Sequence, residues 1–199
     1  IKDFYYPIKT YQKLESDPIN TITNAFSKLA EDESCVVQIL LKPVSDDWQN
    51  ECSEISSKIM EGKKARFSLN PMKVIISLFE LFVMNSEDSK EPSSQNKTSA
   101  LTQERAKTVD EKAEKTGYET IIRIITTGNN KSSTQSNLVN IISSFRQFNY
   151  PDFNGFVSTL RHNEEALIKN YVFRYFKKPF YLKQDLMNTE EIASVFHFP

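Results

Sequence analysis

The sequence predicts an α/β (α+β) fold, a ferredoxin-like split-βαβ sandwich with a long helical insertion between its two middle strands. Two nearly continuous apolar runs, 35–41 and 118–127, are typical of strands covered on at least one face. Each run has a companion segment in which isoleucine and phenylalanine recur at helical spacing. A long stretch stands between the two runs where a simple sandwich would have a hairpin turn.

Six segments follow the β-α-β-β-α-β order of this sandwich. Strands are expected at 4–10, 34–42, 118–127 and 153–160, and helices at 18–31 and 132–148. Asp17 and Pro18 form a strong signal for the start of the first helix. Pro7 makes the first strand an edge strand or a broken one. A plain α/β sandwich of another topology is the alternative.

The stretch between the middle strands is predicted to contain an antiparallel helical arm. Helix 46–61 carries a narrow apolar seam at alternating spacings of four and three, formed by Trp48, Cys52, Ile55 and Ile59. Helix 101–116 carries a thin stripe of Ala106, Val109 and Ala113. Such narrow stripes suit pairing with one partner helix rather than burial in a broad core.

The predicted organisation has four parts. These are the first half of the sandwich at 1–44, the helical-arm insertion at 45–116 with a disordered linker at 85–100, the second half at 117–187, and a terminal helix at 188–199. The linker is predicted from its Ser, Asn, Lys, Glu and Pro composition. Because the terminal helix is apolar and followed at once by Pro199, we expect another domain to follow it.

Composition excludes several classes of function. The formal net charge is −1, which gives no global electrostatic argument for nucleic-acid binding. The four glycines are widely spaced, which excludes a Gly-rich phosphate-binding loop in this stretch. No apolar run reaches the roughly 18 residues of a membrane-spanning helix. The two cysteines, Cys35 and Cys52, lie in apolar contexts and are expected to be buried free thiols.

The apolar helix expected at 71–84 is the first candidate interaction surface. Its large side chains include Ile75, Leu78, Phe79 and Phe82. A helix of this length extends roughly 21 Å, too short for a hydrocarbon core of about 30 Å. Three alternatives are open: packing on its own sheet, docking on a neighbouring subunit, or lying on a membrane surface near the basic cluster 63–66.

The segment 161–178 mixes basic and aromatic residues and is the second candidate surface. The basic residues are Arg161, Lys169, Arg174, Lys177 and Lys178, and the aromatic ones are Tyr171, Phe173, Tyr175 and Phe176. This mixture can stack bases and hold phosphates, so a nucleic-acid-binding α/β module is an alternative function. A solvated edge with extended basic side chains explains the same pattern without a ligand.

The sequence predicts no catalytic, cofactor-binding or metal-binding residues in this stretch. The acidic pairs 46–47 and 190–191 fall at helix starts, where carboxylates are common for capping and dipole reasons. His162 and His197 have no Cys or His nearby at ligand spacing, and His197 is expected to be a packing or hinge residue. A free-standing enzyme is the least supported class.

Several motifs together resemble one bacterial family, the membrane-associated ATPases related to type IV secretion and conjugation ATPases of the HerA–FtsK class. The resembling stretches are DFYYPIKTY (3–11), DPINTITNAFSKL (17–29), VQILLKPVSDDWQ (37–49), FRQFN (145–149), NGF (154–156) and NTEEIASVFHFP (188–199). The similarity covers nearly the whole chain except about 62–100. The motifs are structural, so no catalytic residue can be carried over from the family.

The resemblance implies a pre-motor domain of a homo-oligomeric ATPase. The ATP- and Mg²⁺-binding motor would then follow this domain in the parent protein. The resemblance also implies a place on the cytoplasmic side of the bacterial inner membrane and contacts with neighbouring subunits. Membrane or secretion-apparatus proteins are further expected partners, and nucleic acid would be met through the parent motor. The expected function is that of a non-catalytic accessory or assembly domain in DNA or protein translocation.

Overall fold

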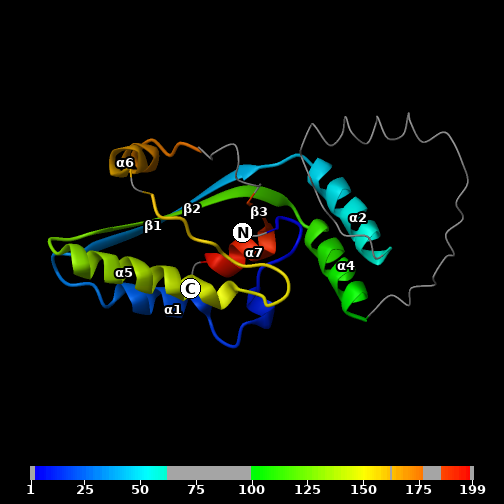
Figure 1. Cartoon of the computed structure of the whole chain (residues 1–199), viewed down its shortest axis with the longest axis horizontal. Coiled ribbons are helices and arrows are strands. Elements are labelled where there is room, and N and C mark those ends of the chain that lie inside the picture. The colour runs from blue at the N-terminus through cyan, green and yellow to red at the C-terminus, as the bar shows by residue number, and fades with distance from the viewer. Residues whose placement is uncertain (1–2, 62–99, 162, 177–184, 198–199) are drawn as a thin grey trace, which may run out of the picture.

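The structure, a computed structural model, describes residues 3–61, 100–161, 163–176 and 185–197. Figure 1 shows helices on both sides of a small sheet and a two-helix arm that projects from one end of it. The helices are α1 (Pro18–Phe26), α2 (Asp47–Met60), α4 (Ala100–Ala113), α5 (Lys131–Ser144), α6 (Glu164–Val172) and α7 (Thr189–Val195). The strands are β1 (Ser34–Pro43), β2 (Gly117–Thr127) and β3 (Leu186–Asn188). The predicted α+β class is confirmed.

The sheet is antiparallel and has the strand order β1-β2-β3 in the described residues. β1 pairs with β2 along its full length, from Ser34 opposite Thr127 to Pro43 opposite Tyr118. β3 pairs only with the start of β2. The two predicted middle strands therefore do pair, although β1 lies at an edge of the described sheet rather than at its centre.

Helices α1 and α5 cover one face of the sheet (Figure 1). Alternate apolar side chains of the two long strands, such as Val37 and Ile124, pack against Ile22 of α1 and Ile141 of α5. Alternation along a strand sends the neighbouring side chains, such as Gln38 and Arg123, to the opposite face. The sheet therefore has one aliphatic face in the core and a second face with a polar centre.

The arm is an antiparallel pair of α2 and α4, as the narrow seams predict. Gln49 Nε2 donates to the Ala113 carbonyl at 2.7 Å, and further along α2 Ser56 Oγ donates to the Ala106 carbonyl at 3.3 Å. The core of the arm contains every residue of the predicted α2 seam and two of the α4 stripe, namely Trp48, Cys52, Ile55, Ile59, Ala106 and Val109. Phe4, Tyr5 and Leu186 close this core at the sheet end of the arm.

The strand predicted at 4–10 is wrong, because this segment has no regular pairing with the sheet. Its backbone donors bond instead to a side chain of α7 and to the 3-10 turn that ends at Phe148. The Ile8 amide donates to Glu191 Oε1 at 2.8 Å, and the Lys9 amide donates to the Phe148 carbonyl at 2.8 Å. Phe4 packs in the arm core and Ile8 in the sheet core, so the segment bridges the two cores.

The strand predicted at 153–160 is also wrong. Asn154 is buried and donates from Nδ2 to the carbonyls of Asp3 at 2.6 Å and Tyr6 at 2.7 Å. Phe156 places its ring edge-to-face against Phe145 and Phe148, with both centroids 5.9 Å away. This loop therefore seals the sheet core and pins the N-terminal segment, and it does not extend the sheet.

The other predicted helices and strands that lie within the described residues agree in kind with the prediction and differ in length. The first helix, predicted to reach residue 31, ends at Phe26, and the helix predicted to reach 148 changes at Phe145 to a 3-10 turn. None of the described helices has the length and apolar composition that crossing a bilayer requires. The predicted helix 71–84 and linker 85–100 lie outside the described residues.

A single methyl group tests the packing of the arm against the sheet. A Cβ added to Gly117 would lie 2.6 Å from Trp48 Cε2, and the Trp48 ring is 4% exposed and closed in by the arm core. We expect Gly117→Ala to lower the free energy of unfolding by about 1–3 kcal/mol, because the ring has no room to move. Denaturant unfolding measures the effect, with Gly128→Ala as the control at an exposed site, where an added Cβ would meet only the side chains of Glu33 and Thr134 at 3.0 Å. Equal losses in both variants would contradict this packing.

Candidate functional site

The candidate site is a buried junction at which four segments of the chain meet. Lys112 of α4 and Glu191 of α7 face each other there with fully buried side chains. Lys112 Nζ lies 3.1 Å from Glu191 Oε2 and 3.2 Å from Oε1. Lys112 Nζ also donates to the carbonyls of Tyr6 at 3.1 Å and Leu186 at 3.0 Å. The ammonium group therefore binds α7, the N-terminal segment and β3 at once.

The carboxylate of Glu191 is equally well satisfied. Its Oε1 accepts from the Ile8 amide at 2.8 Å, and its Oε2 accepts from the Asn188 amide at 2.8 Å. Asn188 Oδ1 accepts from the Glu191 amide at 3.0 Å, which completes a capping box at the start of α7. Asn188 Nδ2 donates to the Lys112 carbonyl at 3.2 Å. The predicted capping role of this glutamate is confirmed, and its ion pair was not predicted.

A second ion pair flanks the buried one toward solvent. Glu190 binds Lys115 Nζ and accepts from Thr10 Oγ1 at 2.7 Å. Burial raises the pKa of Glu190, but the hydrogen bonds from Lys115 and Thr10 and the nearby positive charges outweigh it, so that the pKa lies below the ordinary 4.5. The bond to Glu190 raises the pKa of Lys115 in turn.

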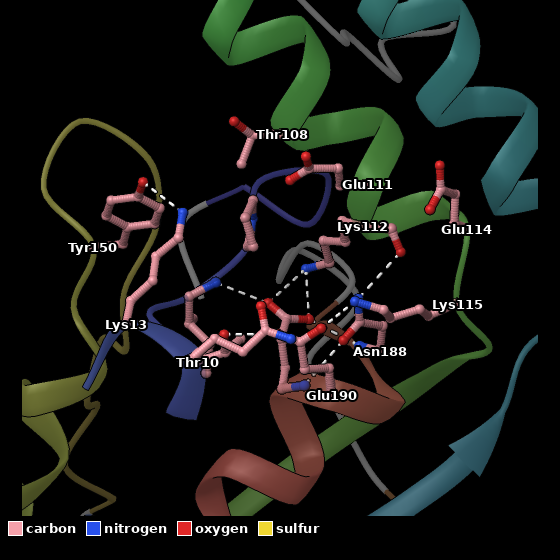
Figure 2. A pocket seen from close by; sticks show the side chains of 14 residues that line it. Thr10, Lys13, Thr108, Glu111, Lys112, Glu114, Lys115, Tyr150, Asn188 and Glu190 are labelled. Atoms are coloured by element: carbon pink, nitrogen blue, oxygen red, sulfur yellow. Dashed lines mark hydrogen bonds and ion pairs between the residues drawn. The ribbon is translucent and has the colours of Figure 1, made fainter. Parts of the chain in front are cut away.

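A cavity of about 210 Å³ opens beside the two ion pairs (Figure 2). Figure 2 shows Lys13 at its rim, where the ammonium group bonds to the hydroxyl of Tyr150 at 2.8 Å. The cavity is lined by charges of both signs, and the two glutamates of α7 are engaged with lysine side chains and backbone amides. Such an arrangement is suited to holding α4, α7 and the N-terminal segment together.

The thiols and the described acidic residues offer little reactive chemistry. Burial is the main cause that raises the pKa of Cys52 to about 12 and that of Cys35 to about 11, so both thiols stay protonated at neutral pH. Both are free thiols, as predicted, although Cys35 is only half-buried. Within the described ranges no group of three or more His, Cys, Asp or Glu side chains is placed to hold a metal ion.

The sequence-predicted surface residues fall into two groups. Ile75, Leu78, Phe79, Phe82, Lys177, Lys178 and His162 lie outside the described residues. Arg161, Lys169 and Arg174 are exposed on α6 or next to it. His197, predicted to be a packing or hinge residue, lies half-exposed at the end of α7, with Nε2 3.5 Å from Asp17 Oδ1. Neither Lys112 nor Arg123, the buried cations of the described chain, is singled out by a sequence motif.

Arg123 holds α6 to the second face of the sheet. Its Nη1 donates to Gln38 Oε1 at 2.7 Å and to the Asn170 carbonyl at 3.1 Å, and its Nη2 donates to the Tyr175 carbonyl. Gln38 Nε2 donates to the Tyr171 carbonyl at 3.1 Å. A positive charge at the carbonyl end of a helix is favourable for the helix dipole. A charged residue in the middle of the strand run 118–127 was the available sequence signal for this contact.

The fold and the junction define an α+β domain whose sheet carries a two-helix arm. The model of a family described as a domain of unknown function (DUF8128) matches residues 1–199, and the chain belongs to this family. No curated protein matches the chain, and no solved structure does.

The buried ion pair makes a double-mutant prediction. Lys112→Met or Glu191→Gln alone should lower the free energy of unfolding by about 3–5 kcal/mol, because each leaves an uncompensated charge or buried polar group. The double variant should lose clearly less than the sum of the two single losses. The matched control is the exposed pair Lys107 and Glu111 on α4, where the corresponding changes should cost about 0.5 kcal/mol or less. Additive losses at the buried pair would show that the two charges do not interact.

The depressed pKa of Glu190 predicts a pH dependence. Because the folded protein holds this carboxyl deprotonated below its ordinary 4.5, the associated stability is complete above that pH and is lost as the pH falls through the lowered pKa. Glu190→Gln should therefore be less stable than the native chain at neutral pH by about 1 kcal/mol or less, since Lys115 is partly exposed. The difference should shrink below the ordinary pKa. Urea unfolding across this range measures it, and a pH-independent difference would contradict the assignment.

Proposed function

We propose that this chain is a non-catalytic accessory and assembly domain of a translocation ATPase related to type IV secretion and conjugation ATPases of the HerA–FtsK class. Support comes from the motif resemblance along most of the chain and from one structural observation. The last described helix, α7, is tied to the arm by the buried contact between Glu191 and Lys112. ATP and Mg²⁺ belong to the motor domain of the parent protein in this proposal.

The junction resists relative movement of α7 and α4. A shift of α7 relative to α4 would separate two fully buried charges, which is costly in a low-dielectric interior. The same shift would break the bonds of Glu191 to Ile8 and of Lys112 to Leu186. Movements of α7 are therefore passed to the arm and the sheet as a unit. An assembly domain needs this property to link a motor to neighbouring subunits or to secretion-apparatus proteins.

The proposal assigns no reaction to this domain. Glu190 and Glu191 bond to lysines, to Thr10 and to backbone amides, which is a structural use of carboxylates. The ferredoxin-like topology is part of the proposal only for the central half of the sandwich. The two paired middle strands and the helices α1 and α5 on one face support it, whereas 4–10 and 153–160 do not form its two outer strands. The cargo in this proposal is DNA or protein.

The first test is the full coding sequence that contains this domain. The proposal expects a loop of the form G-x-x-x-x-G-K-[ST] after a strand in the region that follows Pro199. A parent protein without any such loop would overturn the ATPase assignment.

The second test measures coupling in the intact parent ATPase. Lys112→Met combined with Glu191→Gln should leave ATP hydrolysis in place and lower the amount of DNA or protein moved per ATP, because the buried ion pair between α7 and the arm is removed. Ile141→Ala is the matched control, since it destabilises the sheet core from α5, which is not one of the four segments of the junction. Transport is compared at equal folded fractions of the two variants. If both lost transport equally, the loss would not be specific to the junction and the coupling role would be wrong.

A further inference from the structure

Exposed apolar side chains concentrate on and around α6. Of the twelve large hydrophobic residues that are exposed in the described chain, six lie between 157 and 175. They are Val157, Leu160, Ile168, Val172, Phe173 and Tyr175. Single exposed apolar residues are normal on a protein surface, whereas a cluster of this kind marks an interaction site. We call the outer side of α6 with the turn after it, residues 164–176, the α6 surface.

The α6 surface points away from the rest of the protein. α6 lies on the side of the sheet opposite α1 and α5 (Figure 1). The carbonyls of Asn170 and Tyr171 are bound from the sheet by Arg123 and Gln38. Ile168 and Val172 lie one turn apart on α6 and are 54% and 61% exposed. The apolar stripe of α6 is therefore turned toward solvent.

The sheet holds this surface in a defined conformation. The buried guanidinium of Arg123 also binds the Tyr175 carbonyl, beyond the turn at Arg174, where φ is 52°. The rings of Phe173 and Tyr175 stack with centroids 5.5 Å apart and an interplanar angle of 20°. Arg123 thus binds backbone carbonyls on both sides of the turn, those of Asn170 and Tyr175. The fold therefore holds the aromatic pair in place on the outer side.

Positive charge accompanies the apolar side chains. Lys169 and Arg174 are exposed within the α6 surface, and Arg161 is exposed just before it. The part of this surface that carries the apolar stripe and the aromatic pair, 166–176, contains two cations, Lys169 and Arg174, and no Asp or Glu. The two glutamates of α6 are in its first turn, away from the aromatic pair at its other end. The partner of this surface should therefore be apolar and negatively charged.

We propose that the α6 surface binds the face of a bilayer that contains anionic phospholipids. Ile168, Val172 and the aromatic pair would enter the boundary between headgroups and acyl chains, while Lys169 and Arg174 would contact lipid phosphates. A nucleic acid would pair its phosphates with the cations and stack its bases on the rings, but Ile168 and Val172 would remain in water. This inference does not depend on the proposed ATPase role.

The test is co-sedimentation of the full chain with vesicles of phosphatidylglycerol and phosphatidylcholine in equal parts, compared with phosphatidylcholine alone. Binding should require the anionic lipid and weaken as salt is added. Lys169→Ala and Arg174→Ala should each reduce the affinity by about fivefold. Ile168→Asp combined with Val172→Asp should reduce it by more than tenfold, because charges are then forced into the interface. The matched control is Val139→Asp, which alters an equally exposed valine on α5.

A second measurement avoids disruptive substitutions. The chain has one tryptophan, Trp48, and it is buried in the arm core. Ile168→Trp should show a blue shift of its emission when anionic vesicles are added, and Val139→Trp should show none. The proposal is overturned if anionic vesicles do not bind, or if Val139→Asp weakens binding as much as the α6 changes. Binding of a single-stranded oligonucleotide in place of vesicles, lost on the Lys169 and Arg174 changes, would overturn it in favour of a nucleic-acid module.

Discussion

The contact between Lys112 and Glu191 is the constraint on which the arrangement of the domain depends. Two charges with fully buried side chains are stable only if every polar atom around them is paired. Here the pairing uses the Tyr6 and Leu186 carbonyls and the Ile8 amide, together with the capping box of α7. The N-terminal segment, β3, α4 and α7 must therefore come together in one geometry, because any other leaves a charge unpaired in the interior.

This geometry explains why the domain has two apolar cores rather than one. The arm core and the sheet core meet at the junction, and the same two segments contribute to both. Phe4 and Leu186 pack in the arm core, whereas Ile8 and Met187 pack in the sheet core. The ion pair lies between them, so the arm is fixed to the sheet by packing on one side and by charge on the other. The proposed assembly role depends on this rigid connection.

Arg123 applies the same principle on the opposite face of the sheet. A buried cation again binds backbone carbonyls from a distant segment, those of Asn170 and Tyr175. The contacts of Lys112 and of Arg123 differ in which side chains they leave exposed to solvent. At the junction the helices close over the charged pair, whereas α6 keeps Ile168 and Val172 turned toward solvent. One buried charge thus joins elements inside the domain, and the other holds a surface outward for the proposed membrane contact.

Sequence periodicity alone determined the arm seam of Trp48 and Ile55 and the two long strands that pair. The reason is that the spacing of apolar residues sets which face a helix or strand buries. The sequence also identified the cap at Glu191 and the basic residues Lys169 and Arg174, but not the residues that surround them.

Tertiary structure decided that 4–10 and 153–160 are not strands. Backbone groups of 4–10 are bound by side chains far away in sequence, such as Glu191 for Ile8 and Asn154 for Tyr6. In 153–160 the Phe156 amide is bound by the nearby side chain of Asn149. Tertiary structure likewise turned Lys112 inward from a charged helix, since its carboxylate partner lies 79 residues further along the chain and only folding brings the two together.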